Sequence, residues 1–175
     1  MLINVLLIGD VVGKPGRDIL TERLPAYIAS EKIDFVIANG ENAAQGSGIT
    51  ESLFKELIGA GIDVVTLGDH TWRRKEALPI IEKDERLLRP INYPPECLGR
   101  GMGTYQTRCG MRVAVVVLMG RIFMEPVDCP FHAIDNALKL LGRDPAIVFV
   151  EVHAEATSEK IALGWKLAGR VSCVF

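Results

Sequence analysis

Residues 35–42 of the chain, FVIANGEN, contain the strand and the site around which we expect the rest of the fold to be arranged. The four apolar residues 35–38 predict a short buried strand. Glu41 and Asn42 follow soon after it, and the next loop carries glycines at positions 46 and 48. Charged and amide side chains at the carboxyl end of a strand are well placed to hold a ligand in an open α/β sheet. We therefore expect Glu41 to contact a metal ion.

The alternation of short apolar segments with helical ones recurs along the chain. The expected strands are residues 4–8, 35–38, 63–67, 112–119, 146–150 and 171–175. The expected helices are residues 18–30, 50–58, 73–83, 131–141 and 158–168, with Asp18 as the cap of the first and Thr50 at the start of the second. The strands are continuous Val, Ile and Leu runs, which indicate a mostly parallel sheet flanked by helices. The fold class is therefore α/β, and residues 88–104, rich in proline and glycine, are expected to form a loop or a crossover.

The composition is that of an ordinary globular protein. A length of 175 residues fits one domain, residues 1–175. The formal net charge of −2 argues against binding of duplex nucleic acid through a broad basic surface. The first ten residues, MLINVLLIGD, lack the basic region of a signal peptide and are too few to span a membrane, so we expect no membrane association. The four cysteines are widely spaced without a CxxC motif, which indicates free thiols in a reducing cytoplasm.

Side chains that can bind metal ions follow four of the expected strands. They are Asp10, Glu41, Asp69 with His70, and His153. Carboxylates together with an imidazole suit a divalent ion such as Mn²⁺, Fe or Zn²⁺. Two such ions about 3.5–4 Å apart can clamp a phosphoryl group and generate a hydroxide nucleophile from a shared water, with Glu41 as the bridging carboxylate. Each carboxylate alone could simply cap a turn, but their recurrence at the same end of the strands favours a site.

Other candidate residues have plainer interpretations. His132 lies near the start of a helix, where a histidine is usually a hydrogen-bonded structural residue. The segment VVGKPG, residues 11–16, lacks GK[ST] and matches GxGxxG poorly, so it is a weak nucleotide-binding signal. Trp72 and Trp165 could stack on a base, but we expect packing in the core or at its rim.

Several motifs together resemble the calcineurin-like metallophosphoesterase superfamily, and within it the bacterial 2′,3′-cyclic-nucleotide phosphodiesterases of the YmdB type. The motifs are GDVVGKPGRD, ANGENAAQGSGIT, LGDHTW, GRIFMEP and HAEATSEK, and the resemblance covers nearly the whole chain. It implies an α/β/β/α sandwich with a dinuclear metal centre at the carboxyl ends of the strands. It further implies that Asn42 contacts the phosphate and that His70 stabilises charge there or protonates the leaving oxygen. The metal ligands implied are Asp10 on the first ion, Glu41 between the ions, and Asp69 and His153 on the second.

The sequence departs from this family pattern at three points. Asp69 replaces the neutral amide of the family's LGNHTW, and Glu151 is one methylene longer than the aspartate of DFHAE, where an acid behind the metal ligands is expected. The family continues after the VSCVF-like strand with a GTHTH segment whose histidines complete the metal shell, whereas this chain ends at Phe175. We therefore expect a C-terminally incomplete domain with a weak first metal site, either as a fragment or as a natural short form.

The leading functional prediction is a metal-dependent phosphodiesterase that hydrolyses a small phosphodiester such as a 2′,3′-cyclic nucleotide. The alternative is a non-catalytic module that binds nucleotide or phosphate, or regulates a partner, because two metal-binding histidines of the family are missing. A generic dinucleotide-binding domain is disfavoured, since the chain lacks GxGxxG. An incomplete domain should expose apolar surface, so we also expect a homo-oligomer.

Overall fold

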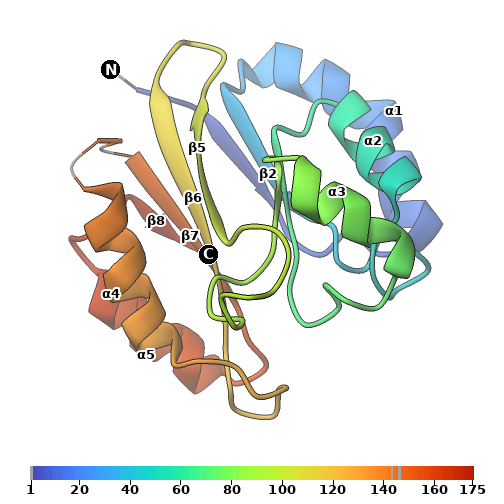
Figure 1. Ribbon diagram of the computed structural model, residues 1–175. Coiled ribbons are helices and arrows are strands. Elements are labelled where there is room, and N and C mark those ends of the chain that lie inside the picture. The colour runs from blue at the N-terminus through green and yellow to red at the C-terminus, as the bar shows by residue number, and fades with distance from the viewer. Residues whose placement is uncertain (1, 143, 146) are drawn as a thin grey trace.

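The computed structural model describes residues 2–142, 144–145 and 147–175. Within them the chain forms four layers, with two sheets packed face to face and helices outside each (Figure 1). In the first sheet all strands are parallel, and they are β1 (Val5–Ile8), β2 (Phe35–Asn39), β3 (Val64–Thr66) and β4 (Leu87–Leu88), in that order. In the second sheet β5 is antiparallel to β6 and the rest are parallel, in the order β5 (Met102–Gln106), β6 (Arg112–Met119), β7 (Ile147–His153) and β8 (Cys173–Val174). The α/β prediction and the implied sandwich are confirmed.

The helices cover the outer faces of the two sheets (Figure 1). Those packed against the first sheet are α1 (Gly13–Glu31), α2 (Glu51–Gly59) and α3 (Leu78–Lys83), which follows a 3₁₀ turn, η1 (Lys75–Ala77). Those packed against the second sheet are α4 (Pro130–Leu141) and α5 (Thr157–Leu167). None of the helices in the described ranges is long and apolar enough to cross a bilayer.

The continuous apolar strands are explained by burial on both faces. Alternate residues of a strand point to opposite sides of its sheet. In β2, Phe35 and Ile37 face the second sheet, whereas Val36 and Ala38 pack under the helices of the first. All four are essentially inaccessible to solvent. Burying an aliphatic or aromatic side chain of this size contributes about 1.5–3 kcal/mol relative to leaving it exposed, so neither face of β2 tolerates a polar residue until the strand ends.

Two helix starts differ in how well they were predicted. The second helix begins where expected, and Thr50 is its cap, because the Thr50 hydroxyl accepts a hydrogen bond from the Leu53 backbone N–H at 3.4 Å. The prediction that Asp18 caps the first helix was wrong, since α1 begins at Gly13 and Asp18 lies inside it. The chain enters the helix at a glycine with φ +56°, and Pro15 fits the first turn, where a backbone N–H has no helical partner.

The segment 88–104, expected to be a loop, carries the chain from one sheet to the other and contains the start of β5. The buried Arg89 organises it, because its guanidinium donates hydrogen bonds to the carbonyl oxygens of Leu98, Pro90 and Cys97 at 2.9, 2.7 and 3.1 Å. The pattern of apolar residues did not predict β4 or β5, because β4 has only two residues and β5 has the sequence MGTYQ, which contains glycine and polar residues. Their extended conformation depends on pairing with β3 and β6 rather than on a local apolar run.

The structure also bears on the predictions for the strand at 146–150, the two tryptophans and the cysteines. The expected strand 146–150 is β7, which runs on to His153, while residue 146 lies outside the described residues. Trp72 packs as expected, with its ring edge-on to Tyr93 at a centroid distance of 5.5 Å. The packing prediction was wrong for Trp165, which is 79% exposed on α5. All four cysteines are free thiols.

Candidate metal centre

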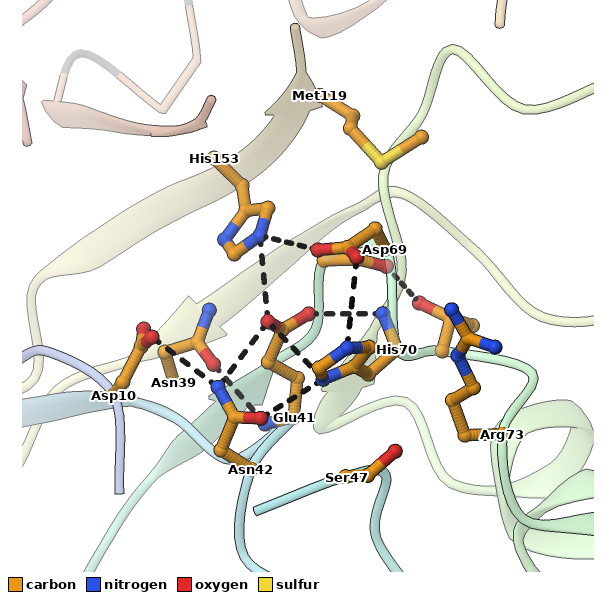
Figure 2. A network of polar contacts seen from close by, with 12 residues as sticks. Asp10, Asn39, Glu41, Asn42, Ser47, Asp69, His70, Arg73, Met119 and His153 are labelled. Carbon is orange, nitrogen blue, oxygen red and sulfur yellow. Dashed lines mark hydrogen bonds and ion pairs between the residues drawn. The ribbon is translucent and has the colours of Figure 1, made fainter. Parts of the chain in front are cut away.

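The parallel strands bring distant residues to one edge of the molecule. Glu41 follows β2, Asp69 follows the neighbouring β3, and His153 is the last residue of β7 in the facing sheet. Each offers one ligand atom, and these atoms lie within 4.8 Å of one another. Figure 2 shows the three side chains converging on one point, His153 from the end of β7 and Glu41 and Asp69 from the loops after β2 and β3. Within the described ranges this is the one group of three or more His, Cys, Asp or Glu residues with such spacing.

The distances in this cluster suit a divalent cation. His153 Nε2 lies 2.9 Å from Asp69 Oδ1 and 3.3 Å from Glu41 Oε1. With metal–ligand bonds of about 2.0–2.2 Å, neighbouring ligand atoms around an ion are roughly 3–3.5 Å apart. Desolvation by burial raises the pKa of the Glu41 carboxyl, and the charge of His153 opposes this shift. Two carboxylates, one of them almost fully buried, lie close to the same imidazole, and a bound cation would neutralise their negative charge.

Asn42 and His70 form a second group beside the cluster. Asn42 Nδ2 donates to Asp10 Oδ2 at 3.3 Å and to Glu41 Oε1 at 3.4 Å. Its amide oxygen therefore faces His70 Nδ1 at 2.8 Å, which requires the proton of the neutral imidazole to be on Nδ1. The His70 backbone N–H donates to Glu41 Oε2 at 3.1 Å, and its Nε2 lies 3.6 Å from Asp69 Oδ2. The second imidazole nitrogen is thus left as an acceptor next to the candidate metal ligands.

Asp10 lies at the margin of this arrangement. It is exposed and touches the other site residues through Asn42, so it is not part of the three-residue cluster. It also lines a cavity of about 370 Å³ together with Asn39, Glu151 and His153. All six residues predicted from the sequence are therefore gathered at one edge, but only three of them make up the cluster.

Three residues that the sequence reasoning did not select support the site. Asn39 Oδ1 accepts the backbone N–H of Glu41 at 3.0 Å, and its Nδ2 donates to Glu151 Oε1 at 2.7 Å. The sequence feature that could have identified Asn39 is its place as the polar residue that ends the apolar run FVIAN. Gly68 lies so close to His153 and Glu41 that a Cβ atom there would overlap both side chains. Gly13 donates its backbone N–H to the Asn42 carbonyl at 2.9 Å, so the VVGKPG segment supports the Glu41–Asn42 loop.

His132 is exposed on α4 and lies outside the cluster, and its expected role as a hydrogen-bonded structural residue stays a prediction. Glu151 is almost fully buried on β7, and this burial raises the pKa of its carboxyl. Its Oε1 is bound to Asn39, but its Oε2 has no hydrogen-bond partner among the described residues. The site thus combines a cluster of possible metal ligands, an amide–imidazole pair and a buried carboxylate behind them.

The chain is similar to several known proteins, including two, from Bacillus subtilis and Mycoplasma pneumoniae, whose names describe phosphoester hydrolysis. It is 44% identical over 171 residues to the 2′,3′-cyclic-nucleotide 2′-phosphodiesterase of Bacillus subtilis, a match that covers 98% of this chain and 64% of that protein. Among solved structures, a hypothetical protein of Thermus thermophilus matches with TM-score 0.90 and 45% identity over 97% of this chain and 65% of that one. A phosphatase of Mycoplasma pneumoniae matches with TM-score 0.88 and 30% identity, over 97% and 62%.

The chain therefore spans less than two thirds of the length of these relatives. A family model described as YmdB-like protein matches residues 6–175, nearly the whole chain. This match agrees with the resemblance carried by the sequence motifs and with the arrangement of the site. The chain belongs to the family of YmdB-like proteins.

Proposed function

We propose that the chain carries the catalytic site of a metal-dependent phosphodiesterase acting on small phosphodiesters, with 2′,3′-cyclic nucleotides as the first candidates. The convergence of Glu41, Asp69 and His153 beside the Asn42–His70 pair is the observation on which the proposal depends. The similarity to the 2′,3′-cyclic-nucleotide 2′-phosphodiesterase of Bacillus subtilis supports the substrate class.

We propose that two divalent ions, Mn, Fe or Zn, bind at this edge. Glu41, Asp69 and His153 would hold one of them, a donor set of oxygen and nitrogen atoms that fits these metals. Asp10 would hold the other together with Glu41, whose two carboxylate oxygens already face different neighbours. When bound, such ions withdraw charge from phosphoryl oxygens and make a water nucleophilic at neutral pH.

Asn42 would bind the phosphate, and His70 would stabilise its charge or protonate the leaving oxygen. The long hydrogen bonds of 3.3 and 3.4 Å from Asn42 Nδ2 can be exchanged for a phosphoryl oxygen without leaving its amide oxygen unpaired, since His70 keeps that contact. Hydrolysis adds water to phosphorus and breaks the bond to a ribose oxygen, which must gain a proton as the water loses one. His70 Nε2 faces the cluster, and protonated it could deliver this proton or stabilise charge on the phosphate.

The test is Mn²⁺-dependent hydrolysis of bis-p-nitrophenyl phosphate and of a 2′,3′-cyclic nucleotide. Glu41→Ala and His70→Ala should lower kcat/KM by about 10²-fold or more, in the range typical of lost acid–base catalysis. His132→Ala, an exposed histidine on α4, is the matched control and should leave the rate unchanged. Rates like those of the starting chain in both site variants would show that the assignment is wrong.

The second candidate is a non-catalytic nucleotide- or phosphate-binding or regulatory module. It is favoured by one feature of the geometry, namely that three ligating side chains meet while Asp10 is reached only through Asn42. Calorimetry with a cyclic nucleotide, run beside the turnover assay, separates the two proposals. Binding without turnover would favour the module, and turnover that depends on Glu41 would favour the enzyme.

A further inference from the structure

Glu151 occupies an unusual place for a carboxylate. It lies on β7 in the sequence IVFVEVH and is only 7% exposed. Ile147 and Phe149 of the same strand pack in the apolar layer between the two sheets, and Glu151 follows them on the same face. Burying a carboxylate in such a layer is costly unless it is well paired. The pairing it does have connects the two sheets directly behind the candidate metal centre.

The partner in the facing sheet is Asn39. It follows Phe35 and Ile37 on the inner face of β2, so the Asn39–Glu151 hydrogen bond joins the inner faces of the two sheets. Because a carboxylate oxygen can only accept, Glu151 fixes the Asn39 NH₂ group toward β7 at 2.7 Å. The amide oxygen of Asn39 is thereby turned toward the backbone N–H of Glu41, which donates to it at 3.0 Å.

We propose that Glu151 is a positioning residue for Glu41 and acts on it through Asn39. The inference rests on the proposed function, in which Glu41 binds metal. The relay holds the backbone of Glu41 so that its carboxylate stays 3.3 Å from His153 Nε2. Residues that orient metal ligands in this indirect way typically change metal affinity or activity by about 10–100-fold when they are lost.

The unpartnered oxygen separates this role from a purely structural one. Glu151 Oε2 is buried and has no hydrogen-bond partner of good geometry among the described residues, although the Thr66 hydroxyl on β3 also lowers the pKa of this carboxyl. Glu151 lines the same cavity as Asp10 and His153. A buried acceptor without a partner costs stability. If Glu151 serves only the fold, its replacement should lower the stability of the chain. If it positions Glu41, its replacement should lower the metal affinity even in a variant whose stability is unchanged.

The experiment measures Mn²⁺ affinity by calorimetry and Tm without metal, on the full chain. Glu151→Gln retains an acceptor for Asn39 and should keep the affinity within about threefold, with Tm unchanged or raised. Glu151→Leu removes the acceptor and should weaken Mn²⁺ binding by about 10–100-fold. Glu159→Leu is the matched control, because Glu159 is a similarly buried glutamate that instead binds the backbone N–H groups of Arg121 and Ile122. It should lower Tm and leave the Mn²⁺ affinity within about twofold.

A double-mutant cycle tests the route through Asn39. Asn39→Ala should weaken Mn²⁺ binding about as much as Glu151→Leu, and the double variant should be no weaker than Asn39→Ala alone. Additive losses, or an unchanged affinity in Glu151→Leu, would overturn the inference. If Glu151→Leu does not fold, an unchanged affinity in Asn39→Ala would overturn it equally. Absence of Mn²⁺ binding by the starting chain would instead contradict the proposed function.

Discussion

At the scale of single residues, Gly68 is the position where the smallest change should have a large local effect. A Cβ atom there would overlap the His153 ring and the Glu41 carboxylate. Both side chains can move, but only by giving up the arrangement that gathers the ligand atoms. We predict that Gly68→Ala lowers Mn²⁺ affinity by about tenfold or more, a change that calorimetry would detect.

The control for this prediction is Gly164, in the middle of α5, where an added Cβ meets no atom within 4 Å. Alanine is favoured over glycine inside a helix, so Gly164→Ala should stabilise the chain by about 0.5–1 kcal/mol and leave metal binding unchanged. An unaltered Mn²⁺ affinity in Gly68→Ala would mean that the close approach at Gly68 does not constrain the ligands.

At the scale of elements, Asp135 joins α4 to the carboxyl-terminal end of α5. Its carboxylate pairs with Lys166 at 2.8 Å and with Arg170 at 2.9 Å. Hydrogen bonds from Lys166 and then Arg170 lower the pKa of Asp135 below its ordinary value of 3.8. A carboxyl whose pKa is lower in the folded state adds stability above its unfolded pKa, and this contribution is lost as the pH falls through the folded pKa.

We therefore predict that Asp135→Asn lowers Tm at pH 7 and that the difference from the starting chain shrinks below about pH 4. Thermal unfolding followed by circular dichroism from pH 3 to pH 8 measures it. Asp18→Asn is the control, because its partner Lys14 lies on the same helix and both side chains are largely exposed, so little should change. A Tm difference that stays constant with pH would show that the charge of Asp135 is not what joins the helices.

The strands show which elements a sequence pattern can find. β2 and β6 are recognisable because burial on both faces demands an unbroken apolar run. β4 and β5 are not so marked, since the first has only two residues and the second contains glycine and polar residues. Such strands form where a neighbouring strand supplies the hydrogen bonds, as β3 does for β4 and β6 does for β5.

At the scale of the whole molecule, homo-oligomerisation stays a prediction. Two large apolar side chains four residues apart on α5, Ile161 and Trp165, are 61% and 79% exposed. Residues four apart on a helix lie on one face, so the pair offers apolar surface that association could cover. Sedimentation velocity should show concentration-dependent association that Trp165→Ser weakens and Tyr27→Ser on α1 does not. A monomer at every concentration would contradict the prediction.

The sequence alone was enough to predict the fold class, the long strands and the six residues now found together at one edge. Each of those residues lies at or soon after the carboxyl end of a strand, and the carboxyl ends of parallel strands meet at one edge, so local pattern was sufficient. The division of the strands between two sheets was predicted from the family resemblance. The sequence of an apolar strand does not reveal it, because a strand buried on both faces is apolar whether helices or a second sheet cover those faces.

Only the tertiary structure decided how the site is supported. Nothing near Glu151 in the chain indicates that its carboxylate reaches Asn39, 112 residues away in the sequence, or that one of its oxygens is left without a partner. The same is true of Gly68, whose missing side chain makes room for His153. These contacts arise from the packing of one sheet on the other, and the distance across that interface is set by all the side chains in it rather than by any local stretch of sequence.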